Sequence, residues 1–175
     1  MLSRKKPDKP NYAFIDAQNL HLGTKDAGFD LDYDKFRIYL KDKYAVEKAY
    51  MFIGYLPKYQ ELYDSLRKKG FILKFKPVLP AKIKEKQKGD IDAHLAFTVM
   101  RYYNEFNKAV VVSSDGDFDT VITYLRAKKK LGMVISPGRN KCSSLLKKAS
   151  GGDISYLDEI GEKIKRTGQN EKAPL

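Results

Sequence analysis

The chain alternates between short, continuously apolar segments and longer segments in which apolar residues recur every three or four positions. Apolar runs rich in β-branched and aromatic residues predict buried strands, here over 12–16, 46–55, 71–75, 108–113, 132–135 and 154–157. Helical spacing predicts helices over 34–43, 58–69, 90–103, 117–130 and 143–148. Strands that alternate with helices indicate parallel βαβ units. We therefore expect an α/β fold, a three-layer α/β/α sandwich around a central parallel sheet.

The length of 175 residues, with 42% hydrophobic and 32% charged residues, suits one folded domain. We expect this domain over 11–160, with basic tails over 1–10 and 161–175. No apolar run approaches the roughly 20 residues of a membrane helix, and no apolar stretch follows the basic N-terminus as in a secretory leader. The single cysteine, Cys142, has no partner for an internal disulfide. These features predict a cytoplasmic protein with no membrane partner.

The charge balance points to a polyanionic partner. Lys and Arg number 34 and Asp and Glu 22, so the net charge is +12. Such a field attracts nucleic acid first and anionic membrane surfaces second, although the lysines could simply face water. A homodimer is left open by the sequence.

Carboxylates follow two of the predicted strands. Asp16 ends the first strand, and Asp115 and Asp117 come directly after the strand over 108–113. In open parallel sheets, ligands bind beyond the carboxyl ends of the strands, where the strand order reverses. Asp92 lies in the first turn of the helix predicted over 90–103, which begins near the same edge. Clustered carboxylates stay ionised when a cation neutralises them, and oxygen ligands suit Mg²⁺ or Mn²⁺.

Each carboxylate also has a structural explanation, and Asp16 could simply start a loop. Asp92 could favour a helix N-terminus by its charge, Asp117 could cap a helix, and Asp115 begins an ordinary Asp-Gly turn. The gathering of all four aspartates at one edge of the sheet, however, favours a metal site. Zinc is disfavoured because the chain has two histidines, His21 and His94, and one cysteine, with no cluster of them.

Three segments resemble, in order and spacing, the motifs of the NYN domain family of PIN-like nucleases. They are FIDAQNL (14–20), KGDIDAHLAFTVM (88–100) and SSDGDF (113–118), and the resemblance extends over 12–157. It implies a sheet in the PIN-like order, with the first strand beside the strand over 108–113. It also implies Mg²⁺- or Mn²⁺-dependent endonucleolytic cleavage, usually of RNA.

The resemblance further implies roles for individual residues. It carries the catalytic and metal-binding roles onto Asp16, Asp92, Asp115 and Asp117, and site-supporting roles onto Asn19, Ser113 and Ser114. Thr98 stands where the helix of the second motif often has a further acidic residue.

Basic residues near these motifs are candidates for contact with a phosphate backbone. The lysine-rich segment 81–89 leads into the second motif and is predicted to be a loop that clamps nucleic acid through Lys82, Lys84, Lys86 and Lys88. A solvated loop is the alternative. Arg139 follows the strand over 132–135 and is a second candidate.

The leading prediction is a metal-dependent endoribonuclease, in which metal-activated water hydrolyses the phosphodiester bond of RNA. The alternative is a catalytically weak or inactive NYN-fold module that binds RNA or serves as a scaffold. A metal-dependent phosphatase acting on small molecules is disfavoured, because an aspartate-nucleophile phosphatase needs a second carboxylate close after the first, where this chain has Gln18.

Overall fold

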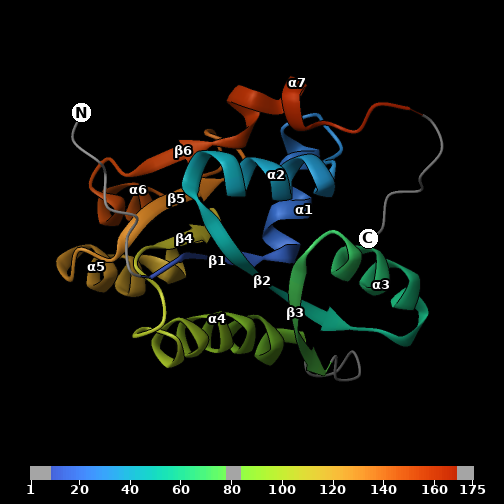
Figure 1. Ribbon diagram of the computed structural model, residues 1–175. Helices are drawn as coiled ribbons and strands as arrows, with labels where there is room; N and C mark the ends of the chain where they lie inside the picture. Colours follow the sequence, from blue (N-terminus) through green and yellow to red (C-terminus); the bar gives the residue numbers. More distant parts are fainter. Residues whose placement is uncertain (1–8, 78–83, 169–175) are drawn as a thin grey trace.

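The computed structural model describes residues 9–77 and 84–168, and its centre is a parallel sheet. The sheet contains β1 (Asn11–Asp16), β2 (Val46–Tyr55), β3 (Phe71–Pro77), β4 (Ala109–Val112), β5 (Leu131–Ser136) and β6 (Ile154–Tyr156). Their order is β3-β2-β1-β4-β5-β6, and each neighbouring pair is parallel (Figure 1). The predicted parallel α/β architecture is confirmed.

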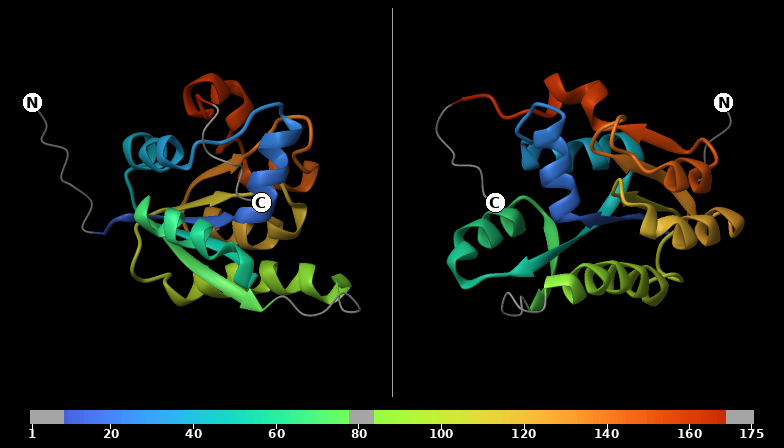
Figure 2. Two further views of the ribbon diagram at one scale, coloured as in Figure 1. Left: turned by 90° about the vertical axis from the view of Figure 1, so that its right-hand side faces the viewer. Right: turned by 180° about the vertical axis from the view of Figure 1, so that it is seen from behind.

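Helices cover both faces of the sheet (Figure 2). One face is covered by α1 (Ala17–Asp26), α2 (Tyr33–Tyr44), α3 (Gln60–Lys68) and α7 (Gly161–Ile164), and the other by α4 (Lys84–Arg101), α5 (Asp119–Ala127) and α6 (Ser144–Ser150). Short 3₁₀ turns occupy Pro57–Tyr59, Gly116–Phe118 and Leu157–Ile160. No helix among the described residues has the length and apolarity needed to cross a bilayer.

The protein has one hydrophobic core on each face of the sheet, because side chains alternate between the two faces along each strand. Ile15 and Val112 point to the core beneath α1 and α2, whereas Phe14 and Val111 point to the core beneath α4 and α5. Successive strand residues face opposite sides of a sheet, so strands buried on both faces must be apolar throughout. This is why the central strands are readable in the sequence as unbroken apolar runs.

The sheet has one position at which the strand order reverses, between β1 and β4. From β1 the chain proceeds outward to β2 and β3, and then crosses back to β4, β5 and β6 on the other side. Ile15 lies opposite Val112 in the β1–β4 pairing. Asp16 and Ser113 are the next residues in each strand direction, so the ends that carry the candidate motifs are adjacent.

Two helices differ from the sequence-based expectation. The pattern did not predict α1, which begins immediately after Asp16 and buries Leu20. The prediction that α4 begins at Asp90 was wrong, since the helix begins at Lys84. Lys84, Lys86 and Lys88 therefore belong to a helix rather than to a loop, whereas Lys82 lies outside the described residues.

The C-terminal segment is packed against the domain beyond residue 160, where the sequence-based boundary set the start of a tail. Gly161–Ile164 forms α7, and Ile164 is buried. Leu31 and Lys165 form an antiparallel bridge, and the Arg166 N–H donates to the Asp30 carbonyl at 2.8 Å. This helix contains only two apolar or small residues, Gly161 and Ile164, so the sequence has too little apolar periodicity to reveal the packing.

Candidate metal centre

Three carboxylates converge where β4 ends and α4 passes. One ligand oxygen from each of Asp92, Asp115 and Asp117 lies within 4.8 Å of the other two. Asp92 and Asp115 are half-buried and Asp117 is exposed. The fourth predicted residue, Asp16, is outside this group, but it lines the same pocket as Asp92 and Asp115. The pocket has a volume of about 420 Å³.

Asp92 comes from the interior of α4. It follows Lys84 by eight residues (92 − 84 = 8), which is more than two helical turns. Favourable interaction of a carboxylate with the helix dipole is confined to the first turn. The prediction that Asp92 lies in the first turn of its helix is therefore wrong, and stabilisation of a helix N-terminus does not explain its presence.

The other aspartates also have local structural roles. The Asp16 side chain caps α1 by accepting the Asn19 N–H at 3.1 Å. The Asp115 Oδ1 atom accepts the Asp117 N–H at 3.1 Å and caps the turn Gly116–Phe118. A capped turn holds Asp115 and Asp117 in one fixed relative orientation. The capping explanation and the metal explanation are therefore compatible for these residues.

Polar contacts hold the ends of β1 and β4 together. The Asn19 side-chain oxygen accepts two hydrogen bonds from Ser114, from its N–H at 2.8 Å and from its hydroxyl at 3.1 Å. The buried Ser113 hydroxyl accepts the Asp115 N–H at 3.1 Å. The structure thus places the three residues predicted to support the site in contacts that fix the loop after β4 against α1.

Gly116 allows the aspartate turn to approach α6 closely. A Cβ atom at Gly116 would lie 2.5 Å from the Ser143 hydroxyl oxygen and 3.2 Å from its Cβ. The Ser143 N–H donates to the Ser114 carbonyl at 3.0 Å, and its hydroxyl caps α6 by accepting the Leu145 N–H. The glycine therefore belongs to the framework that sets the position of Asp115 and Asp117.

Among the described residues that line the pocket, Lys141 is the basic one. It lines the pocket and forms a 2.7 Å ion pair with Asp26 at the end of α1. Arg139, the predicted phosphate contact, is not among the pocket-lining residues. Its guanidinium forms an ion pair with Glu159 and lies 4.2 Å from the centre of the Tyr156 ring. Lys141 was missed by sequence reasoning, although it lies two residues after Arg139 in the same loop.

The donor set fits a single hard divalent cation. Mg²⁺ binds oxygen at about 2.1 Å, so oxygens on opposite sides of one ion lie about 4.2 Å apart. The oxygens of Asp92, Asp115 and Asp117, all within 4.8 Å of one another, are close to this spacing. Among the described residues the group contains carboxylates and no histidine or cysteine, which favours Mg²⁺ or Mn²⁺ over zinc.

Comparisons with known proteins agree with this architecture. A family model described as NYN domain matches residues 12–157. A crystal structure of a protein of unknown function from Vibrio parahaemolyticus is similar with a TM-score of 0.71 and 19% sequence identity, over 93% of this chain and 99% of that one. At this identity the likeness shows the fold alone. No curated protein matches the chain.

Proposed function

Because the chain belongs to the NYN domain family, a nuclease-type family whose model matches most of its length, we propose that it is a metal-dependent endoribonuclease. The observation that carries the proposal is the convergence of the Asp92, Asp115 and Asp117 oxygens within 4.8 Å of one another. This convergence occurs at the β1–β4 edge, where open parallel sheets bind ligands. The proposed metal is Mg²⁺ or Mn²⁺.

In this proposal Asp92, Asp115 and Asp117 hold the ion, and Asp16 faces the same pocket from the end of β1. A bound divalent ion supplies Lewis-acid polarisation of the phosphate and lowers the pKa of a water ligand. Asn19 and Ser113 keep the carboxylates in place through the loop after β4. Lys141 offers the cationic contact for a phosphate oxygen at the pocket wall.

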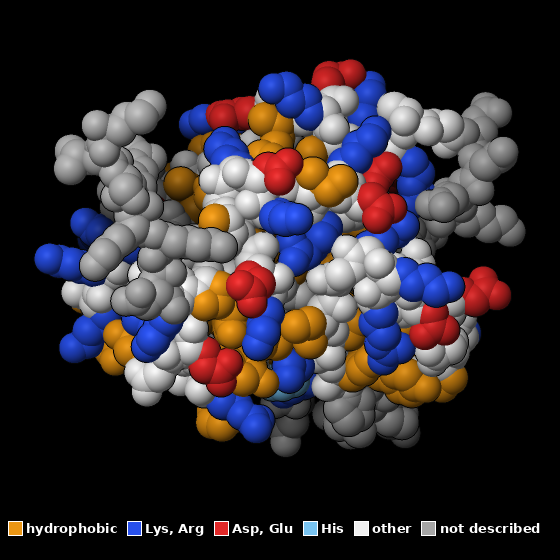
Figure 3. Space-filling model, viewed as in Figure 1, with side chains coloured by type: hydrophobic (Ala, Val, Ile, Leu, Met, Phe, Trp, Pro, Cys, Tyr) orange, Lys and Arg blue, Asp and Glu red, His pale blue; other side chains and the backbone are white. Residues whose placement is uncertain are grey.

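RNA is the proposed substrate because the protein as a whole is strongly basic. The net charge is +12, and Figure 3 shows Lys and Arg side chains spread over the face in view, with fewer acidic ones between them. A positive field concentrates polyanions near the surface. Lys84, Lys86 and Lys88, in the first turns of α4, lead toward Asp92 and stay proposed contacts to the phosphate backbone.

The test is cleavage of a fluorescent single-stranded RNA with Mn²⁺ or Mg²⁺, with EDTA, and with Asp115→Asn. We expect cutting by the wild type with either ion, and its loss with EDTA. Asp115→Asn should lower the rate at least about 100-fold, since it removes one of three ligand carboxylates. Asp119→Asn is the matched control. It removes the same charge two residues beyond Asp117, from a side chain outside the carboxylate group.

Equal cutting by the wild type and by Asp115→Asn would refute the metal assignment. Salt-sensitive RNA binding without turnover in any divalent ion would instead support a non-catalytic RNA-binding module. Thr98 is the residue that favours the non-catalytic alternative. It is buried and its hydroxyl donates to the His94 carbonyl at 2.7 Å, so this position offers no further carboxylate.

A further inference from the structure

An apolar groove runs from the carboxylates along the outer surface between α4 and α5. Its volume is about 480 Å³, within the range of ligand sites. Asp92 and Asp117 form one end of it, and Phe97, Met100 and Tyr124 line the rest together with smaller residues. Both helices cover the same face of the sheet (Figure 1). The groove is thus continuous with the candidate metal centre.

The apolar side chains of the groove are exposed to solvent. Phe97 is 66% exposed, Met100 44% and Tyr124 39%. Phe97 and Met100 lie four and seven residues after Ala93, so they share one face of α4. A contiguous apolar surface beside a functional site marks a place for a ligand or partner. The core does not explain these side chains, because their partners in the fold cover only part of them.

A cationic group lies at the far end of the groove from the carboxylates. The Lys128 ammonium lies 5.8 Å from the centre of the Tyr124 ring, and Lys128 directly follows α5. The surface therefore changes in order from carboxylates to aromatic side chains to a lysine ammonium.

This order matches the repeating chemistry of a single strand of nucleic acid. We infer that the groove is a subsite for an unpaired nucleobase next to the scissile phosphate, stacked on Phe97 and Tyr124; this inference rests on the proposed nuclease function. At 1.5 Å per residue, Phe97 lies about 7.5 Å along α4 from Asp92, which is about the reach from a phosphate to the base of an adjoining nucleotide. The next phosphate then approaches Lys128. Within a duplex the stacked neighbouring pairs cover both faces of a base, so the groove selects single-stranded RNA.

The experiment measures binding in EDTA, so that cleavage does not interfere. Two labelled RNA oligonucleotides of equal length are compared by fluorescence anisotropy, one with ordinary bases and one with abasic positions. Phe97→Ala should weaken binding of the ordinary strand at least about fivefold, the loss expected for one stacked base, and leave binding of the abasic strand unchanged. Phe97→Trp should retain binding, and Phe97→Leu should not, since it keeps the apolar surface without a ring.

Ile38→Ala is the matched control, because Ile38 is 57% exposed on α2, on the opposite face of the sheet. It should bind both strands as the wild type does. Equal binding by Phe97→Ala and the wild type overturns the subsite, and the proposed function survives if the wild type still cuts RNA. If the wild type is a dimer and Phe97→Ala is a monomer, the nucleobase subsite is overturned, and the groove is instead a contact between two copies of the chain. Failure of the wild type to bind or cut RNA overturns both proposals.

Discussion

Asp92 illustrates how a single side chain distinguishes a functional cluster from a structural one. It lies in the interior of α4, within 4.8 Å of two further carboxylates. Asp16 and Asp115 each accept a backbone N–H and so contribute to a cap. Negatively charged carboxylates held this close together repel one another unless a cation is bound.

We therefore predict opposite effects of Asp92→Asn with and without metal. In EDTA the variant should unfold about 2–4 °C above the wild type, if relief of repulsion contributes about 1 kcal/mol to the free energy of unfolding. Saturating Mn²⁺ should raise the melting temperature of the wild type but not of the variant, because only a ligand bound to the folded state stabilises it. Differential scanning calorimetry measures both, with Asp119→Asn as control. A variant less stable than the wild type in EDTA contradicts the repulsion argument.

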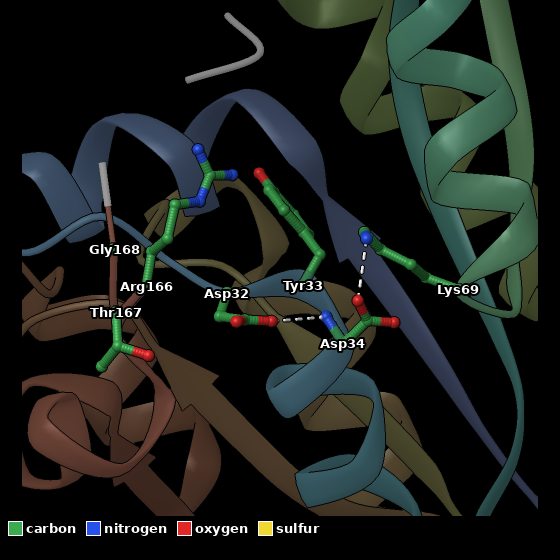
Figure 4. Close-up of a pocket in the computed structure, with 7 residues that line it drawn as sticks. All are labelled: Asp32, Tyr33, Asp34, Lys69, Arg166, Thr167 and Gly168. Carbon is green, nitrogen blue, oxygen red and sulfur yellow. Dashed lines mark hydrogen bonds and ion pairs between the residues drawn. The ribbon is translucent and has the colours of Figure 1, made fainter. Parts of the chain in front are cut away.

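Tyr33 gives a prediction at alkaline pH. Burial raises the pKa of the Tyr33 hydroxyl from 10.0 to about 12, and the opposing charge of Arg166 lowers it by less. Figure 4 shows the hydroxyl directed toward the Arg166 guanidinium. Below pH 10 both the folded and the unfolded states hold the proton, so the contribution to stability is fully present. Above pH 10 the unfolded state releases its proton first, and the contribution is lost by about pH 12.

The expected loss between pH 9 and pH 12 is about 2 kcal/mol, from a pKa difference of about two units. Urea unfolding of the wild type and of Tyr33→Phe at pH 9 and pH 12 measures it, because the phenylalanine variant has no proton to lose at this position. The difference between the two proteins should change by this amount in the direction that disfavours the wild type. An unchanged difference would mean that the Tyr33 hydroxyl titrates equally in both states.

Among the elements, α1 depends on one close contact for its position. A Cβ atom at Gly23 would lie 2.5 Å from the Cβ of Pro137 and 2.8 Å from its Cγ. The proline ring has little freedom to move, and it immediately follows β5. Gly23 therefore brings α1, with Asp16 and Asn19 at its start, against the end of β5.

Gly23→Ala should displace α1 and lower the free energy of unfolding by about 1–3 kcal/mol, the usual cost of overpacking. RNA cleavage should fall as well, because Asn19 loses its alignment with Ser114. The double variant Gly23→Ala/Pro137→Ala should recover part of both losses, since it removes the ring that the new methyl group meets. Chemical denaturation and the cleavage assay report the two effects separately. No recovery in the double variant would show that the contact with Pro137 is not the cause.

The predictability of an element from the sequence depended on how much of it is buried. The strands at the centre of the sheet were readable because both faces are covered. The α1 helix was missed because Leu20 is its one large buried apolar residue, whereas Leu22 is 52% exposed and Gly23 interrupts the pattern. The first turns of α4 contain only charged and polar residues and a glycine, so apolar periodicity could not show where this helix begins.

The candidate metal centre was predictable from the sequence only in part. Residues that end a strand or closely follow it are placed by the topology, so the positions of Asp16 and Asp115 at this edge followed from the sequence. The involvement of Arg139 in an ion pair depends on Glu159, twenty residues later. The groove between α4 and α5 depends on how two distant helices sit together. No local pattern in the sequence contains either of these facts.

Over the molecule as a whole, the positive charge could act in two ways, as a general field or through particular contacts. The two can be separated by matched triple substitutions. Replacing Lys84, Lys86 and Lys88 with alanine removes three charges near the start of α4. Replacing Lys41, Lys43 and Lys163 removes three exposed charges from α2 and α7, which cover the face of the sheet opposite α4.

Both triple variants lower the net charge by the same amount, but only contacts with phosphates release counterions. If all three α4 lysines touch phosphates, the slope of log binding constant against log salt should become shallower by about 2.1, at about 0.7 per contact with a single strand. The α2 and α7 variant should keep the wild-type slope. Anisotropy titrations of single-stranded RNA at several salt concentrations in EDTA measure these slopes. Equal slopes in all three proteins would mean that the α4 lysines act only through the general field, because a contact that neutralises a phosphate must leave a trace in the salt dependence.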